Sequence, residues 1–523
     1  VTLEDKVHLP LLYISYPTVS LGDPQEPALD IFADVLGGSA SSMLYQSLVK
    51  TGKAIEVGAS HSCEELACTL AVYAYPNPAV DGSLKTLKGE VDKVIGEFAQ
   101  RGIKPADLEK AISSYRASAI WGLDSIEGKV SQLAMGQVMT RDPNYVFKNL
   151  DAISQVNAQQ VKAAYDKFIA NRHSVVLSVV PKGKTQWQAG TPNFTPAKRE
   201  LPDYSQHGEQ LAQQTIKDSF DRSVQPRTAE AVSVKVPAIW HGKLDKGIEI
   251  IGTRSDEIPA VSIMIALPGG IRAEGKGELG LASLTAAMLG QGTARLSEAE
   301  LSDELQKLGA SISVSTAQYN NLITISSLTD KLPQTLALVR EVLLQPGLRE
   351  ADFERLKAQT LQGMKQSEQQ PEWLAGQAFR ELVYGKQNRL GQPTDGVLTD
   401  VERLTLADVK RFYHAYYNST NAKVVVTGDV TQQQVEQQLG FLTEWQGAAP
   451  TLGDLKLKGE QARAGIYLVD KPGAPQSVIR IGRRAMPFDT TGEYFVANLM
   501  NFNLGGNFNS RINLNLREDK GYT

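Results

Sequence analysis

The sequence predicts an α+β fold built from tandem homologous domains. Three observations support this prediction. Stretches with the periodicity of strands and of helices alternate along the chain, a proline-rich connection separates two long folded parts, and the end of the chain repeats its beginning. A chain of 523 residues is also too long for one compact core, so we expect three or four domains.

The first folded part covers about residues 1–190 and begins with a strand followed by a helix. Leu9 to Tyr16 is apolar enough for a buried strand. Asp23-Pro24 then supplies an N-cap and a first-turn proline for a helix that ends at Gly37-Gly38. Residues 54–61 and 69–75 both have the composition of strands, and we expect them to form a hairpin.

Two more helices and a strand complete this part. A helix that stops at Gly102 is predicted by apolar residues at helical spacing, namely Leu84, Leu87, Val91, Val94, Ile95 and Phe98. A third helical pattern runs through Leu108, Ile112 and Tyr115. Ser174 to Val180 is predicted to be a buried strand because of its length and its β-branched residues.

Two cysteines, Cys63 and Cys68, flank the turn of the predicted hairpin. They could face each other across it and form a disulfide in an oxidising compartment. The alternative, which we favour from the sequence alone, is a pair of small, partly buried thiols. The neighbouring run His61-Ser62-Cys63-Glu64-Glu65 lacks a second histidine at helical spacing, so no metal site is predicted there.

A long connection follows the first part. Residues 191–237 include Pro192, Pro196, Pro202 and Pro226, many Gln, Ser and Thr, and little periodicity. We predict a surface linker between two large halves of the chain.

The second folded part, residues 238–450, again mixes strands and helices. Strands are predicted at 247–253, 260–267, 312–314, 322–325 and 423–427, and helices at 333–344 and 350–366. Ser297 and Glu300 have the spacing of a capping box, which opens a further helix that Gly309 closes. A last segment, residues 462–523, follows a short Gly/Ala/Pro stretch.

An internal repeat links the two ends of the chain. Leu36-Gly37-Gly38 recurs as Leu504-Gly505-Gly506, an offset of 468 residues, and Ser42 and Leu48 recur as Ser510 and Leu516. We therefore expect residues 11–48 and 479–516 to adopt the same strand–loop–helix unit. In the second copy, Ser477 to Ile481 would be the strand.

Composition excludes two classes of function. The chain is 42% hydrophobic and 21% charged with a net charge of −4, and no Lys/Arg-rich stripe stands out, so nucleic acid is not an expected partner. No apolar run approaches the roughly 18 residues of a membrane span. The first residues lack the apolar stretch of a signal peptide, and both ends look cut from a longer protein.

One helix of the second part carries a resemblance to a known family. Residues 280–293, Gly-Leu-Ala-Ser-Leu-Thr-Ala-Ala-Met-Leu-Gly-Gln-Gly-Thr, resemble the active-site helix of the insulinase/pitrilysin (inverzincin) zinc metallopeptidases, which reads Gly-Leu-Ala-His-x-x-Glu-His-Met-x-x-x-Gly-Thr. The frame fits, but Ser283, Ala286 and Ala287 stand where the family has its first histidine, its glutamate and its second histidine. Serine and alanine supply neither the imidazole ligands nor the general base. The family's third ligand is a glutamate on a later helix, and between Glu354 and Glu368 there is none. We therefore expect no metal and no catalytic residue in this chain.

Other stretches share the resemblance. Residues 424–430 resemble the strand and Gly-Asp turn that close the family's catalytic-type half, and 36–48 and 504–517 both resemble a Leu-Gly-Gly…Ser-Arg-Leu…Leu-Arg-Glu stretch of its other half. The resemblance implies tandem homologous two-layer domains with mainly antiparallel sheets packed with helices, and two repeats that close as a clamshell. Residues 1–190 would then be the second half of repeat one, 238–450 the first half of repeat two, and 462–523 the start of its second half.

The resemblance also implies a function. The whole protein would be a zinc-dependent endopeptidase that hydrolyses peptides or small proteins in an enclosed chamber, with its zinc helix about 185 residues before Val1, at the repeat offset from Ser283. Arg517 matches a family arginine that binds substrate together with a tyrosine seven residues later, which would be residue 524; Val49 holds this position in repeat one. The alternative is a non-catalytic scaffold or partner subunit. The resemblance implies a periplasmic location and allows a dimer.

Overall fold

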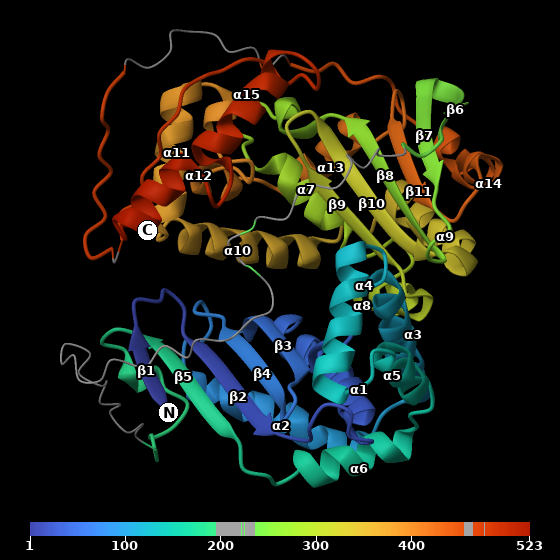
Figure 1. Cartoon of the computed structure of the whole chain (residues 1–523), viewed down its shortest axis with the longest axis vertical. Coiled ribbons are helices and arrows are strands. Elements are labelled where there is room, and N and C mark those ends of the chain that lie inside the picture. Colours follow the sequence, from blue (N-terminus) through green and yellow to red (C-terminus); the bar gives the residue numbers. More distant parts are fainter. Residues whose placement is uncertain (195–220, 222–223, 225–235, 454, 456–463, 475) are drawn as a thin grey trace. The chain divides into compact units, whose positions relative to one another are not determined.

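The computed structural model describes residues 1–194, 221, 224, 236–453, 455, 464–474 and 476–523 (Figure 1). The described chain forms two compact units, one of residues 1–366 and 394–453 and the other of residues 367–393 and 454–523. Most of the predicted linker lies outside the described residues. The predicted domain boundaries therefore stay predictions.

The first sheet of the larger unit has five strands in the order β1-β5-β2-β4-β3. Their bounds are Thr2–Asp5 (β1), Leu11–Pro17 (β2), Ala54–Cys63 (β3), Cys68–Pro76 (β4) and Val175–Pro181 (β5). β1 and β5 are parallel, and every other pair is antiparallel. The four strands predicted in this part are confirmed.

Six helices accompany this sheet: α1 (Glu26–Gly37), α2 (Leu84–Arg101), α3 (Pro105–Trp121), α4 (Ile126–Met135), α5 (Tyr145–Ser154) and α6 (Ala158–Phe168). α1 and α2 pack directly on the strands, and α6 packs on both helices. All six apolar residues that predicted α2 are buried, and Gly102 ends that helix with φ +59°.

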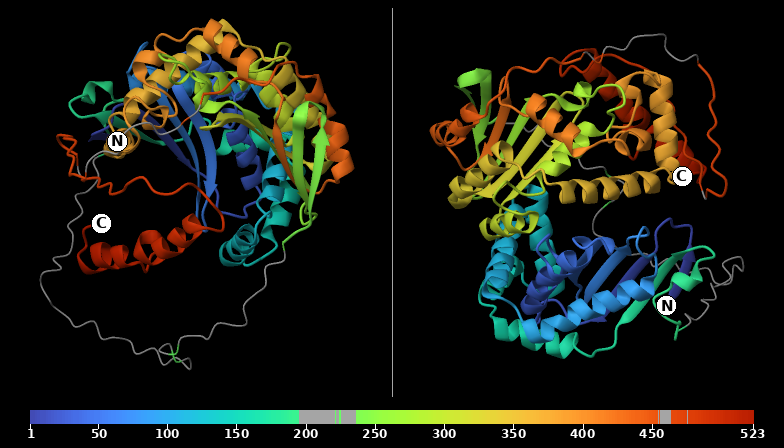
Figure 2. Two further views of the ribbon diagram at one scale, coloured as in Figure 1. Left: turned by 90° about the horizontal axis from the view of Figure 1, so that it is seen from above. Right: turned by 180° about the vertical axis from the view of Figure 1, so that it is seen from behind.

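The second sheet of this unit has six strands in the order β6-β7-β11-β8-β10-β9. Their bounds are Ile239–Leu244 (β6), Ile248–Arg254 (β7), Ala260–Pro268 (β8), Ser311–Thr316 (β9), Asn320–Leu328 (β10) and Lys423–Gly428 (β11). β7 and β11 are parallel and the rest are antiparallel. Figure 2 shows the same strands from above and from behind.

The helices of this second part are α7 (Leu281–Leu289), α8 (Glu298–Leu308), α9 (Leu332–Leu344), α10 (Glu350–Ser367), α12 (Leu398–Val401), α13 (Leu406–Tyr416) and α14 (Gln432–Gln438). The predicted capping box is confirmed: Ser297 and Glu300 bond reciprocally at the start of α8, and Gly309 ends the helix with φ +58°. β6, α12, α13 and α14 were not predicted.

The two sheets share one topology. In each, the first core strand runs parallel to the last (β1 with β5, β7 with β11), and the last strand pairs with the strand that leads into a buried helix. That strand (β2 or β8) is flanked by a hairpin whose second strand is the inner one. The order strand, helix, hairpin, helix, strand is thus used twice, with α1 and α7 at equivalent places. This confirms the predicted α+β architecture of homologous, mainly antiparallel domains.

The predicted start of the first helix is wrong by two to three residues. Gln25 precedes the first helical residue, and Pro27, not Pro24, is the first-turn proline. Asp23 instead closes a turn, in which its Oδ1 accepts the N–H of Gln25 at 2.8 Å. A short polar side chain stabilises a turn as readily as a helix start, so the sequence alone did not separate the two.

The cysteines form a disulfide, which corrects our preference for two thiols. In the register of the hairpin, Cys63 on β3 lies directly opposite Cys68 on β4, so both side chains project from the same face of the sheet. The sequence located the hairpin but did not give this register.

The smaller unit contains α11 (Pro371–Tyr384), α15 (Glu493–Asn501) and α16 (Arg511–Asn513). The repeat holds for its helical part: α15 lies at the offset of α1, and the π-helical turn at Leu514–Asp519 lies at the offset of the one at Tyr45–Val49. It fails for the strand, because residues 477–481 form none. In the first sheet β2 pairs with β4 and β5, whereas residues 477–481 pair with none of the described strands.

Apolar side chains of α15 are exposed where the corresponding side chains of α1 are buried. Leu499 and Met500 are 59% and 65% exposed, whereas Ile31 and Phe32, at the same places of the repeat, are fully buried.

Among the described residues, no helix combines the length and the apolar character that a membrane span requires.

Candidate functional site

The helix α7 keeps the backbone features of the resemblance for structural reasons. Gly280 has φ +101°, and a Cβ there would come within 2.5 Å of the Asp395 carbonyl oxygen, so glycine is required. Oε1 of Glu274 accepts the N–H groups of Gly280 and Ala282 at 3.0 and 2.9 Å, which satisfies the start of the helix.

The end of the motif is held in a similar way. Gly292 has φ +103°, and a Cβ there would meet the Leu296 carbonyl oxygen at 2.5 Å. Thr293 is fully buried; its N–H donates to the carbonyl of Leu296 at 2.8 Å, and its Oγ1 accepts the N–H of Leu296 at 2.9 Å. These bonds shape the turn that leads into α8, and they need no metal.

The three positions at which the family has its histidines and glutamate differ in their exposure to solvent. Ser283 is partly exposed, and its hydroxyl donates to Asp395 Oδ1 at 3.2 Å. Ala286 is 3% exposed and faces the core, whereas Ala287 is exposed. These residues offer one neutral hydroxyl and two methyl groups, so they do not fit a zinc ion.

Among the residues that the structure describes, no group of three potential ligand side chains lies at α7. Within the described ranges, one group of three potential ligand residues comes together, formed by His61, Cys63 and Cys68 on the first sheet. The resemblance places the family's third ligand on α10, whose residues 355–367 include no glutamate.

α10 instead contributes to a charge network that the sequence did not predict. Lys50 Nζ lies 2.7 Å from Asp352 Oδ1 and 3.1 Å from Glu298 Oε2. Arg355 Nη2 lies 2.9 Å from the same Glu298 oxygen. The side chains of Glu298, Asp352 and Arg355 are only 10%, 8% and 13% exposed. Two cations and two carboxylates therefore balance within one largely buried network that joins the two sheet-bearing parts.

Tyr45 completes this network. Its hydroxyl donates to Glu298 Oε1 at 2.7 Å. Burial, and then the neighbouring Glu298 carboxylate, raise the pKa of Tyr45, so the hydroxyl stays a donor. A second contact between the same parts is made by Lys110, whose Nζ lies 2.5 Å from Asp303 Oδ1. We interpret these contacts as structural, because each charged group in them is paired and none is free to act as a base or a nucleophile.

Arg517 lies in the smaller unit, in the π-helical turn that follows α16. Its side chain is 55% exposed, its guanidinium lies 5.3 Å from the centre of the Phe508 ring, and its Nε is 3.8 Å from Glu518 Oε1. Neither contact is strong, so the guanidinium is available to a further partner. Val49, at the same place of the repeat, is 2% exposed.

Two models of known protein families match stretches of the chain. A family model described as the peptidase M16 inactive domain matches residues 1–115 and 403–523. A second model, described as insulinase (peptidase family M16), matches residues 250–394, which include α7.

Individual relatives are distant. The chain is 23% identical to the non-peptidase homolog YmxG of Helicobacter pylori over 55% of this chain and 67% of that protein. It is 26% identical to the uncharacterized zinc protease SCO5738 of Streptomyces coelicolor over 45% of this chain and 52% of that protein. A crystal structure of a peptidase M16 inactive domain from Pseudomonas fluorescens is 21% identical, with a TM-score of 0.44, over 54% of this chain and 68% of that one. The chain thus spans about half to two thirds of these proteins.

Proposed function

The chain belongs to peptidase family M16, the insulinase family, and from that premise we propose that it is the non-zinc-binding portion of a zinc-dependent metalloendopeptidase. In this proposal the longer protein hydrolyses peptides or small proteins held in an enclosed chamber, and this chain supplies part of the chamber wall. The zinc belongs to the other repeat, because α7 here has no residue that can bind it.

One observation carries the proposal. α7 keeps the glycines, the capped start and the terminal turn of a zinc helix, yet Ser283, Ala286 and Ala287 replace all three functional groups. Selection that preserves the fold while losing the ligands is expected of the second repeat in a protein whose first repeat performs catalysis. Arg517 would then extend from the last quarter toward substrate bound at the zinc.

A second candidate is a non-catalytic scaffold or partner subunit. The relative named as a non-peptidase homolog favours it, because M16 members without peptidase activity exist among the proteins that this chain resembles. The buried charge network supports either candidate, since both require the two sheet-bearing parts to hold one arrangement.

We also propose an extracytoplasmic, periplasmic location. The pairing of Cys63 with Cys68 supports it, because disulfides persist mainly in oxidising compartments. A dimer remains part of the proposal.

Zinc content and peptide cleavage test the proposed function. The longer protein that contains this chain should hold one zinc per chain and cleave a fluorogenic peptide library, and a chelator should abolish the cleavage. Residues 1–523 alone, with the disulfide intact, are the matched control and should hold no zinc and cleave nothing. A longer protein without zinc or cleavage would establish the scaffold candidate instead.

A further inference from the structure

A cluster of metal-ligand side chains lies on the first sheet, outside the α7 region. His61 and Cys63 are two residues apart on β3, so they project from the same face of the sheet, and Cys68 of β4 lies opposite Cys63 on that face. One ligand atom from each of the three residues lies within 4.8 Å of the others. Nδ1 of His61 faces this centre, at 3.9 Å from Cys63 Sγ.

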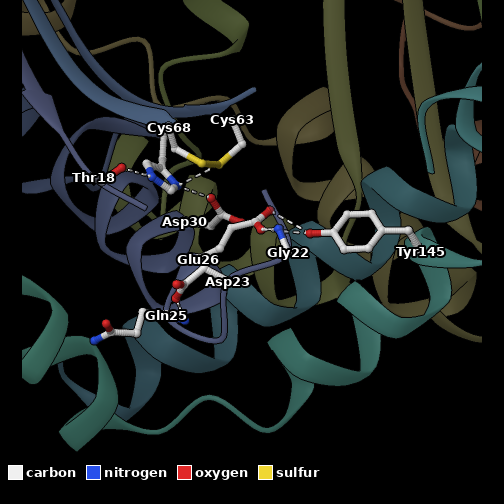
Figure 3. Close-up of a disulfide and its surroundings, with 10 residues drawn as sticks. Thr18, Gly22, Asp23, Gln25, Glu26, Asp30, Cys63, Cys68 and Tyr145 are labelled. Atoms are coloured by element: carbon white, nitrogen blue, oxygen red, sulfur yellow. Dashed lines mark hydrogen bonds and ion pairs between the residues drawn. A yellow bond between two sulfur atoms is a disulfide. The ribbon is translucent and has the colours of Figure 1, made fainter. Parts of the chain in front are cut away.

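The helix α1 adds a carboxylate to the cluster. Asp30 Oδ1 lies 2.7 Å from His61 Nδ1, and Figure 3 shows Asp30 directed at the disulfide. Glu26, one turn earlier on the same face of α1, is 3% exposed and is bonded by the Tyr145 hydroxyl and the Gly22 N–H, both neutral donors. Two buried carboxylates therefore face a single imidazole, which leaves an electrostatic potential that favours a bound cation.

Three of the four side chains of the cluster are shielded from water, and Cys63 is partly exposed. The His61 side chain has no exposed surface, the Asp30 side chain is 10% exposed, and Cys68 is fully buried. Ligands held in a buried, preformed arrangement need little reorganisation to bind a metal ion.

We propose that reduction of the Cys63–Cys68 disulfide converts this cluster into a zinc site. The ligands are the two cysteine sulfur atoms, His61 Nδ1 and Asp30 Oδ1. Four ligands of these types suit Zn²⁺, whose bonds of about 2.0–2.3 Å bring neighbouring ligand atoms to roughly 3–4 Å from one another. One ligand atom from each of His61, Cys63 and Cys68 already lies within 4.8 Å of the others, and Asp30 Oδ1 lies 2.7 Å from His61 Nδ1, so side-chain rotations bring the four ligands into place.

The chemistry balances with a dithiol as the reductant. The dithiol gives two electrons and two protons, the Cys63–Cys68 bond breaks to two thiols, and the reductant becomes a disulfide. Zn²⁺ then displaces both thiol protons. The imidazole proton moves from Nδ1, where it bonds Asp30, to Nε2.

Thr18 makes this proton shift possible. Its Oγ1 lies 2.9 Å from His61 Nε2, and a hydroxyl both donates and accepts. It donates to Nε2 in the disulfide form and accepts from the Nε2–H group in the zinc form. Bonds of this kind orient histidine ligands in metal sites. The disulfide and the metal exclude each other, because each uses both sulfur atoms.

The test compares the same full chain in two redox states. Residues 1–523 are treated anaerobically with or without a water-soluble phosphine, mixed with Zn²⁺, and passed through a desalting column. We expect one zinc per reduced chain and none per oxidised chain. Co²⁺ in place of Zn²⁺ should give intense near-ultraviolet absorption from thiolate-to-metal charge transfer in the reduced chain only. A reduced chain without zinc, or an oxidised chain with an equal amount, would overturn the proposal.

Variants locate the site within the chain. Cys63→Ser with Cys68→Ser should abolish zinc binding in both redox states, while Ser62→Ala, on the opposite face of β3, should leave it unchanged. Thr18→Val should weaken zinc binding about tenfold, as expected for a bond that orients a ligand, and Asp30→Asn should weaken it at least as much. Circular dichroism checks that each variant folds. Zinc retained by the double serine variant would refute the site.

Discussion

Lys50 Nζ lies 2.7 Å from Asp352 Oδ1, although the two residues are 302 positions apart in the sequence. The contact joins the end of the first π-helical turn to α10, and so links the two sheet-bearing parts of the larger unit. Because Glu298 and Arg355 complete the network, its two positive and two negative charges offset one another.

Removing one charge from this network should destabilise the protein. Glu298→Gln keeps the side-chain shape and an acceptor for Tyr45, but it leaves Lys50 and Arg355 sharing the Asp352 carboxylate. We expect a loss of about 3 kcal/mol in the free energy of unfolding, at the lower end for a broken buried pair because Lys50 is 32% exposed. Urea unfolding measures it. Glu90→Gln breaks the exposed pair with Lys53 and should cost less than about 1 kcal/mol. Equal losses in the two variants would contradict a special role for the buried network.

A glutamate placed at position 286 of α7, where the family has its general base, should destabilise this protein. Ala286 is 3% exposed, so Ala286→Glu would bury a carboxylate in the core. We expect a loss of about 2–4 kcal/mol in the free energy of unfolding. Ala287→Glu, on the exposed face of the same helix, should change it by no more than about 0.5 kcal/mol.

Rebuilding the whole motif extends this experiment. The triple variant Ser283→His, Ala286→Glu and Ala287→His should still cleave no peptide, because α10 offers no third ligand between residues 355 and 367. Peptide cleavage by that variant would show that the chain holds a complete ligand set after all.

Glu26 should make stability fall as pH rises. Burial raises the pKa of this carboxyl above its usual value, despite the bonds from Gly22 and Tyr145. Between the unfolded and folded pKa values the native protein holds a proton that the unfolded chain has lost, so the free energy of unfolding decreases with pH in this window. Glu26→Gln should flatten that decrease. Urea unfolding from pH 4 upward measures it, with Glu97→Gln on the exposed face of α2 as the control. Parallel curves for wild type and Glu26→Gln would contradict the raised pKa.

Local patterns along the chain predicted most of the helices and strands. The helix at 84–101 and the capping box at Ser297 were predictable because their apolar spacing and end residues lie within one segment. The strand expected at 477–481 was not, because a strand forms only where partners accept its hydrogen bonds. Residues 11–17 have such partners on both sides, whereas residues 477–481 pair with none of the strands that the structure describes.

The candidate site divides in the same way. Loss of the zinc ligands was predictable, because Ser283, Ala286 and Ala287 lie within one recognisable stretch. The cluster around His61 was not, because Asp30 is 31 residues from it in the sequence and the hairpin register alone places Cys68 beside Cys63. The sequence therefore indicated the hairpin turn between Cys63 and Cys68, whereas the contacts of His61 are known only from the folded structure.

Arg517 gives the sharpest test of the proposed peptidase. A guanidinium that reaches the scissile carbonyl would stabilise the charge that develops on its oxygen, and this contact strengthens in the transition state. In the longer protein, Arg517→Ala should therefore lower kcat by roughly a hundredfold, with a smaller effect on KM and an unchanged zinc content. Arg511→Ala, an exposed arginine of α16, is the matched control and should leave kcat unchanged. Full turnover in the Arg517 variant, with zinc intact, would reduce Arg517 to a surface residue, and loss of zinc would show that it acts on the fold of the catalytic repeat instead.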